Sequence, residues 1–230
     1  MLDNDIIQAA IDLADPAGID PAALLAVIDV ESGGRAFARI DGRDEPLIRF
    51  EGHYFDRRLS GNRREQARAA GLASPTPGKI ANPRSQSARW ALFRRAAAID
   101  HKAACESVSW GLGQVMGAHW AWLGYGNVDD LVAEARAGVA GQIRLMLRYV
   151  EKAGLTRPLK ERDWPTFARG YNGPLYRRHR YDTRLANAYA RYRSAGLATA
   201  RLPGTASPKQ DRRGWLKRIA YALRAALGVI

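Results

Sequence analysis

The stretch LLAVIDVESGG, residues 24–34, decides the fold of this chain, and Glu31 is its central residue. Leu24, Val27 and Ile28 precede Glu31 by seven, four and three positions, so on an α-helix all four residues lie on one face. A carboxyl group on the apolar face of a helix is partly buried, and burial favours its neutral, protonated form. The pattern therefore predicts a helix whose inner face carries an acid.

Two glycines, Gly33 and Gly34, follow this acid and mark the end of the helix. Glu31 is then in or next to the last turn, where the negative end of the helix dipole also disfavours a charged carboxylate. Both effects raise the pKa of Glu31, as a general acid at neutral pH requires. The alternative is a glutamate at a helix end that simply points into water, and this stretch alone does not decide between the two.

Composition limits the class of protein. With 230 residues, of which 47% are hydrophobic and 26% charged, the chain is typical of a soluble globular protein with one main domain. Its net charge of +13 predicts attraction to polyanions, whether nucleic acid, anionic lipid or acidic cell-surface polymers. The single cysteine, Cys105, excludes an internal disulfide. Four scattered histidines without an HExxH pattern lead us to expect no metal ion and no cofactor.

The N-terminal residues are acidic and lack the basic and apolar regions of a signal peptide. No apolar run approaches the roughly 20 residues needed to span a bilayer. We therefore expect a protein that is made soluble in the cytosol and that needs outside help for any export.

The periodicity predicts a mainly α-helical chain with one small β element. Asp20 before Pro21 is an N-cap followed by proline at the first helical position. An Asp-Gly step within residues 38–52 predicts a β-hairpin, the only place where we expect strands. Further expectations are helices at 5–15, 53–59, 87–107, 128–153 (two helices), 165–170 and 176–195, a long surface loop at 60–88, and a glycine-rich turn running into a helix at 109–117.

Three further motifs follow Glu31 in the order RFEGHYF (49–55), SWGLGQ (109–114) and GYNGP (170–174). They offer a second carboxylate with a histidine, a glutamine on a tight turn, and a tyrosine with an asparagine at a helix break. Taken singly, each is equally well explained as local structure: a surface acid, a packing turn, or an ordinary break between helices.

The order of the motifs resembles that of the lysozyme-like glycosidases that cut peptidoglycan, in particular goose-type lysozymes and soluble lytic transglycosylases. More closely, VESGG, RFEGHYF, SWGLGQVMG and ARGYNGP look like the N-acetylmuramidase family found in phage endolysins. The resemblance covers about residues 1–195. It implies a mainly α (α+β) lysozyme-like fold with a small β-hairpin lobe.

The resemblance also implies roles for individual residues. Glu31 matches the general acid that protonates the glycosidic oxygen between N-acetylmuramic acid and N-acetylglucosamine. Tyr171 matches the tyrosine whose hydroxyl would orient the Glu31 carboxyl, with Asn172 beside it. Ser109 and Gln114 match the turn that lines the cleft near the acid.

Hydrolysis needs a second group that activates water or stabilises the oxocarbenium-like transition state. The candidates are Glu51, Asp41 and Asp44, with Glu51 the first choice because it belongs to the RFEGHYF motif. The close alternative is lytic transglycosylation, in which Glu31 acts as acid and then as base and the muramyl 6-hydroxyl replaces water. Gly113 and the YNGP sequence depart from the transglycosylase pattern. An alternative of another class is a non-catalytic module that binds cell wall or nucleic acid.

The last part of the chain differs in composition. We expect a muramidase catalytic domain over residues 1–196, a linker over 197–212 and a basic amphipathic helix over 213–230. That helix either packs as an ordinary last helix, or binds an anionic membrane or lipopolysaccharide surface, or binds nucleic acid, for which it has no base-reading motif. The resemblance implies peptidoglycan as the partner and a monomeric protein. It also implies that the protein stays in the cytoplasm of a host bacterium until it is released to the cell wall.

Overall fold

The computed structural model describes residues 2–196. The predicted linker at 197–212 and the predicted basic helix at 213–230 lie outside the described residues. Within the described part, the helices and 3-10 helices are α1 (Asn4–Ala17), α2 (Pro21–Ser32), α3 (Gly52–Arg58), α4 (Gly61–Ala69), α5 (Gln86–Ala97), α6 (His101–Glu106), η1 (Gly117–His119), α7 (Val128–Arg136), α8 (Val139–Lys152), α9 (Thr156–Glu161), α10 (Trp164–Asn172), η2 (Tyr176–His179) and α11 (Tyr181–Ser194). The strands are β1 (Phe37–Ile40), β2 (Arg43–Pro46), β3 (Ile48–Phe50), β4 (Val108–Trp110) and β5 (Val115–Met116). The predicted mainly α (α+β) class is confirmed.

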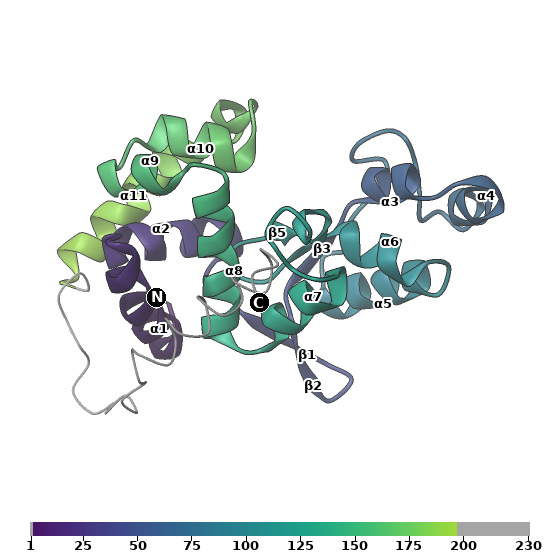
Figure 1. Cartoon of the computed structure of the whole chain (residues 1–230), viewed down its shortest axis with the longest axis horizontal. Helices are drawn as coiled ribbons and strands as arrows, with labels where there is room; N and C mark the ends of the chain where they lie inside the picture. The colour runs from purple at the N-terminus through teal and green to yellow at the C-terminus, as the bar shows by residue number, and fades with distance from the viewer. Residues whose placement is uncertain (1, 197–230) are drawn as a thin grey trace, which may run out of the picture. The chain divides into compact units, whose positions relative to one another are not determined.

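Helix α2 has the ends that the sequence predicts. The Asp20 side chain accepts a hydrogen bond from the backbone N–H of Ala22, Pro21 is the first helical residue, and Gly33 ends the helix with a φ of 62°. Eight of the twelve residues of α2 are buried, so the helix is enclosed on nearly all sides. Helix α11 packs along it, as Figure 1 shows. The acid near its C-terminal end, Glu31, is therefore carried by a largely buried helix and is itself partly buried.

The buried side chains form two hydrophobic cores. The first contains α1, α2, α10 and α11, and the second contains the strands β3 and β4 with helices α3 to α7. Helix α8 contributes to both, because Ile143 and Met146 face the first core while Leu145 faces the second. In Figure 1 α8 lies between these two groups of elements. The glycine-rich turn at 111–114 also reaches the first core, through Leu112.

The predicted hairpin is present, but the prediction that strands occur only there is wrong. Strands β1 and β2 pair antiparallel across Asp41 and Gly42, both with positive φ, as a type I′ turn requires. A second sheet has the order β3-β4-β5 and joins residues 48–50 to 108–116. The segment at 109–117 is thus a tight hairpin followed by a 3-10 helix, in place of the expected turn into an α-helix. Its strands are two or three residues long, too short for any alternation of polarity to reveal them.

Other predicted boundaries are also corrected. The expected loop at 60–88 contains α4, which buries only Ala67 and so lacks an apolar stripe. The expected helix at 87–107 is two helices, because Asp100 caps α6 by accepting from the backbone N–H of Ala103. The expected helix at 176–195 is interrupted at Arg180, whose φ is 53°. Helix α9 was not predicted, and α10 continues through the YN pair to end at Gly173.

Candidate active site

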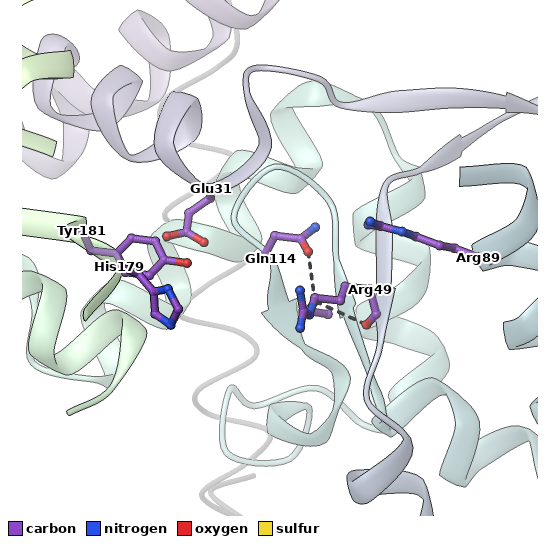
Figure 2. A pocket seen from close by; sticks show the side chains of 7 residues that line it. Glu31, Arg49, Arg89, Gln114, His179 and Tyr181 are labelled. Carbon is purple, nitrogen blue, oxygen red and sulfur yellow. Dashed lines mark hydrogen bonds between the residues drawn. The ribbon is translucent and has the colours of Figure 1, made fainter. Parts of the chain in front are cut away.

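A pocket of about 440 Å³ opens at the C-terminal end of α2, in the size range of ligand sites. Both hydrophobic cores contribute to its walls, and Figure 2 shows the carboxyl group of Glu31 pointing into it. The residues that line the pocket are Glu31, Arg49, Arg89, Ser109, Gln114, His179 and Tyr181. Three of the predicted site residues, Glu31, Ser109 and Gln114, therefore meet there although the chain separates them by up to 83 positions.

Burial raises the pKa of Glu31 from 4.5 to about 7. Two weaker effects oppose burial: the side chain of Asn172 hydrogen-bonds to the carboxyl group, and the positive charge of Arg184 lies near it. Arg184 is held in place by a 2.9 Å hydrogen bond from its Nη2 to the backbone carbonyl of Val30. Sequence reasoning did not identify Arg184, which was only one of several basic residues in the predicted helix at 176–195. A carboxyl group with a pKa near 7 can deliver a proton at neutral pH.

Asn172, and not Tyr171, bonds to the carboxyl group of Glu31. Asn172 Nδ2 donates to Glu31 Oε1 at 2.7 Å, whereas the Tyr171 hydroxyl donates to the backbone carbonyl of Gly113 at 2.7 Å. The expectation that Tyr171 would orient the carboxyl directly is thus not what the structure shows. Because α10 continues through both residues, their side chains leave the helix in different directions, and that of Tyr171 stacks on Phe167. Burial raises the pKa of Tyr171 well above 10, which keeps its hydroxyl protonated.

The turn at 111–114 places the two other predicted cleft residues. Gln114 has a φ of 48°, and its side chain donates to the backbone carbonyl of Gly111 at 2.8 Å. Its Oε1 accepts from the Ser109 hydroxyl at 3.0 Å. The buried side chain of Gln142 fixes the same turn by accepting from the backbone N–H of Leu112 at 2.8 Å. The position of the polar wall opposite Glu31 is therefore fixed by hydrogen bonds within the turn and from Gln142.

A second pocket of about 300 Å³ lies beside the first and shares Gln114 with it. Its lining residues include four aromatic or imidazole side chains together with the YNG segment: Tyr54, Gly113, Gln114, Val115, Met116, His119, Tyr149, Gly170, Tyr171, Asn172 and Gly173. Asn172 lines this pocket while its amide bonds to Glu31 in the other. The Glu31–Asn172 pair therefore stands where the two pockets meet.

The three candidates for the second carboxylate do not line either pocket. Glu51 accepts from Arg49 Nε at 2.7 Å, and Arg49 itself lines the first pocket. Asp41 and Asp44 lie in the exposed hairpin and pair with Arg94 and an arginine of β1. Glu51 thus contacts a residue that lines the pocket, whereas the arginines that pair with the two aspartates do not line it. A role of any of them in water activation stays a prediction.

The pocket also contains residues that sequence reasoning missed. Arg49 and Arg89 line the wall formed by β3 and α5, and His179 and Tyr181 line the wall at the start of α11. Arg49 belongs to the RFEGHYF motif, but only the glutamate and the histidine of that motif were considered from the sequence. No local pattern marks Arg89, because its place in the pocket wall depends on the packing of α5 against β3.

One group of side chains outside the pockets could hold a metal ion. His101, Cys105 and Asp129 have potential ligand atoms that all lie within 4.8 Å of one another, on α6 and α7. His101 Nε2 lies 2.7 Å from Asp129 Oδ1 and 3.7 Å from Cys105 Sγ. Burial is the main cause that raises the pKa of the Cys105 thiol to about 12. Across residues 2–196 no helix is both long and apolar enough to cross a membrane.

Comparison with known proteins places this geometry in a family. The family model described as N-acetylmuramidase matches residues 20–193. The crystal structure of the Burkholderia AP3 phage endolysin is similar, with 32% sequence identity, a TM-score of 0.67, and coverage of 82% of this chain and 71% of that one. None of the curated proteins compared with the chain matches it. The family match spans the acid, the second sheet and both pockets, and by it the chain belongs to the N-acetylmuramidase family.

Proposed function

We propose that this protein hydrolyses the β-1,4 bond between N-acetylmuramic acid and N-acetylglucosamine in peptidoglycan, with Glu31 as the general acid. Membership of the N-acetylmuramidase family makes peptidoglycan the substrate class. The observation that carries the proposal is the carboxyl group of Glu31, which points into a pocket and has a pKa of about 7. Such a group is largely protonated in mildly acidic to neutral solution, so it can donate to a leaving oxygen.

The geometry supports a specific division of labour. Glu31 donates its proton to the glycosidic oxygen as the bond to the muramyl C1 breaks, and positive charge develops on that sugar. The carboxylate left behind is stabilised by the hydrogen bond from Asn172 and by the charge of Arg184. Both interactions strengthen as the proton leaves, which favours the transition state over the ground state. Water then completes hydrolysis, with Glu51 as the candidate second carboxylate.

One similar solved structure is that of a phage endolysin. We extend that role to this chain: it would accumulate in the cytoplasm of a host bacterium and act on the cell wall after release. The predicted affinity of residues 213–230 for an anionic membrane or lipopolysaccharide belongs to the same proposal. Deletion of residues 201–230 tests it, because unchanged binding to anionic liposomes would contradict a membrane role.

One observation favours lytic transglycosylation as a second candidate. Among the residues that the structure describes, Glu31 is the only carboxylate that lines either pocket. Transglycosylation needs only one such group, because the same carboxylate takes a proton from the muramyl 6-hydroxyl after acting as acid. The two reactions leave different ends on the muramyl residue, a reducing end after hydrolysis and a 1,6-anhydro end after transglycosylation.

Mass spectrometry of digested sacculi decides between the candidates. Reducing muramyl ends are the expected result, and 1,6-anhydromuramic ends would contradict hydrolysis. Glu31→Gln should abolish product formation, whereas Glu161→Gln, a change at an exposed ion pair on α9, should leave it intact. If Glu31→Gln lysed permeabilised cells as well as the wild type did, the enzymatic proposal would fail and a binding module would be the better description.

A further inference from the structure

The wall of the first pocket that faces Glu31 carries two guanidinium groups. Arg49 extends from β3 and Arg89 from α5, and Figure 2 shows both side chains on the same side of the pocket as Gln114. Below the pKa of Glu31, about 7, the acid is neutral. In that state no lining residue carries a negative charge to balance the two arginines.

Arg89 is partly buried without a counter-charge. Its Nε donates to the backbone carbonyl of Pro83 at 2.8 Å and its Nη1 to that of Ile48 at 3.1 Å. Within residues 2–196 no carboxylate lies within ion-pair distance of it, whereas Arg58, which is buried to a similar degree, pairs with Glu106 at 3.0 Å. Burial and the positive charges of Arg49 and Arg35 lower the pKa of Arg89. A half-buried cation held by carbonyl groups among like charges gains stability when an anion arrives.

Arg49 is only partly neutralised. Its bond to Glu51 uses Nε, and a guanidinium group offers five N–H donors in a planar fork. In the described part of the chain no acceptor is bonded to the Nη groups of Arg49 or to Nη2 of Arg89. Fork-shaped donors of this kind match the two oxygens of a carboxylate. The wall therefore presents unused donors that suit a carboxylate better than a neutral hydroxyl.

We infer that Arg89 and Arg49 form a subsite for the carboxylate that distinguishes N-acetylmuramic acid from N-acetylglucosamine. This inference rests on the proposed function, since it names the substrate group that the same pocket recognises. The muramyl sugar carries a lactyl ether, and N-acetylglucosamine does not. The carboxylate has two possible sources: the lactyl group itself in glycan without peptides, or the acidic residues of the peptide stem attached to it.

Binding of matched oligosaccharides tests the inference, with Glu31→Gln in every chain to prevent turnover. The probes are chitotetraose, a muramyl tetrasaccharide without stems and the same tetrasaccharide with stems, each titrated calorimetrically against the full chain. Arg89→Gln and Arg49→Gln should each weaken binding of a muramyl probe by about tenfold or more, as expected for hydrogen bonds to a charged group. Chitotetraose binding should change less than about twofold. Loss only with the stem-free probe assigns the lactyl carboxylate, and loss only with the stem-bearing probe assigns the stem. Loss with both shows that the two arginines bind whichever carboxylate the muramyl residue carries.

Two matched variants guard against a purely structural effect. Arg95→Gln removes another arginine of α5 that bonds a backbone carbonyl, that of Ala70 at 2.8 Å, and should leave all three affinities unchanged. Arg89→Lys keeps the charge and should recover part of the muramyl affinity. Equal losses with all three probes, or no loss with either muramyl probe, would overturn the inference. Turnover of sacculi by the wild type is measured separately, so a failed proposed function remains distinguishable from a failed subsite.

Discussion

We predict that the hydrogen bond from Asn172 to Glu31 controls the upper pH limit of activity. It joins Nδ2 to Oε1 over 2.7 Å and stabilises the charged carboxylate more than the neutral acid. Replacement Asn172→Leu removes the donor while keeping a side chain of similar size, so water does not enter. A hydrogen bond to a charged group contributes about 1.5–3 kcal/mol, and about 1.4 kcal/mol corresponds to one pKa unit. The pKa of Glu31 should therefore rise by about one to two units from its value of about 7.

The assay is the pH profile of kcat/KM for solubilised peptidoglycan. A general acid is active when protonated, so kcat/KM falls as the pH rises through the pKa of the free enzyme's acid. The descending limb should lie near pH 7 in the wild type and shift to about pH 8–9 in Asn172→Leu. Asn187→Leu, at an exposed position of α11, should leave the limb in place. A limb that stays near pH 7 in Asn172→Leu, or moves to lower pH, would refute this reasoning.

Three further predictions concern stability. Folding raises the pKa of Glu31 from 4.5 to about 7, so the free energy of unfolding of the wild type declines as the pH rises between these values. In urea unfolding, Glu31→Gln should therefore be more stable than the wild type by up to about 3 kcal/mol at pH 8 and equally stable below pH 4.5. Gly113→Ala would bring a Cβ within 2.7 Å of Met146 Cβ and 3.0 Å of the Tyr171 hydroxyl, so thermal unfolding should show a loss of about 1–3 kcal/mol. Gln142→Leu leaves three buried backbone groups without its hydrogen bonds, and denaturant unfolding should show a loss of about 3 kcal/mol or more.

Local signals in the sequence were sufficient to predict helix α2 and the partial burial of Glu31 near its C-terminal end. Asp20, Pro21 and Gly33 fix the two ends of α2, and the apolar face of that helix predicts a partly buried Glu31. These features predict the direction of the pKa shift, since burial is its main cause, but they leave open whether the side chain points inward. The hairpin across Asp41 was also predictable from local sequence, because an Asp-Gly step readily adopts the two positive φ angles of a type I′ turn.

Features that depend on distant segments were not predictable in this way. Strand β3 pairs with β4 across about 60 residues, and neither strand is long enough to show a period. The place of Arg89 in the pocket wall depends on that pairing, because α5 packs against β3. That Asn172, and not Tyr171, bonds to Glu31 depends on where α10 ends: its last residue is Asn172, two positions beyond the predicted end at 170.

We predict that the acidity of Glu31 and the recognition of substrate by the arginine wall can be changed separately, because the two features belong to different cores. The two side chains that act on the pKa of Glu31, Asn172 of α10 and Arg184 of α11, belong to elements of the first core, as does α2. The cationic wall belongs to the second core, through β3 and α5, and neither Arg49 nor Arg89 is among the causes of the shifted pKa. Variants of the wall should therefore change KM for muramyl substrates while leaving the descending pH limb in place. Variants of Asn172 should move the limb while leaving the preference for muramyl over chitin-like glycan unchanged. If Arg89→Gln shifted the limb as well, the wall and the acid would be coupled through the pocket, and their assignment to separate functions would be wrong.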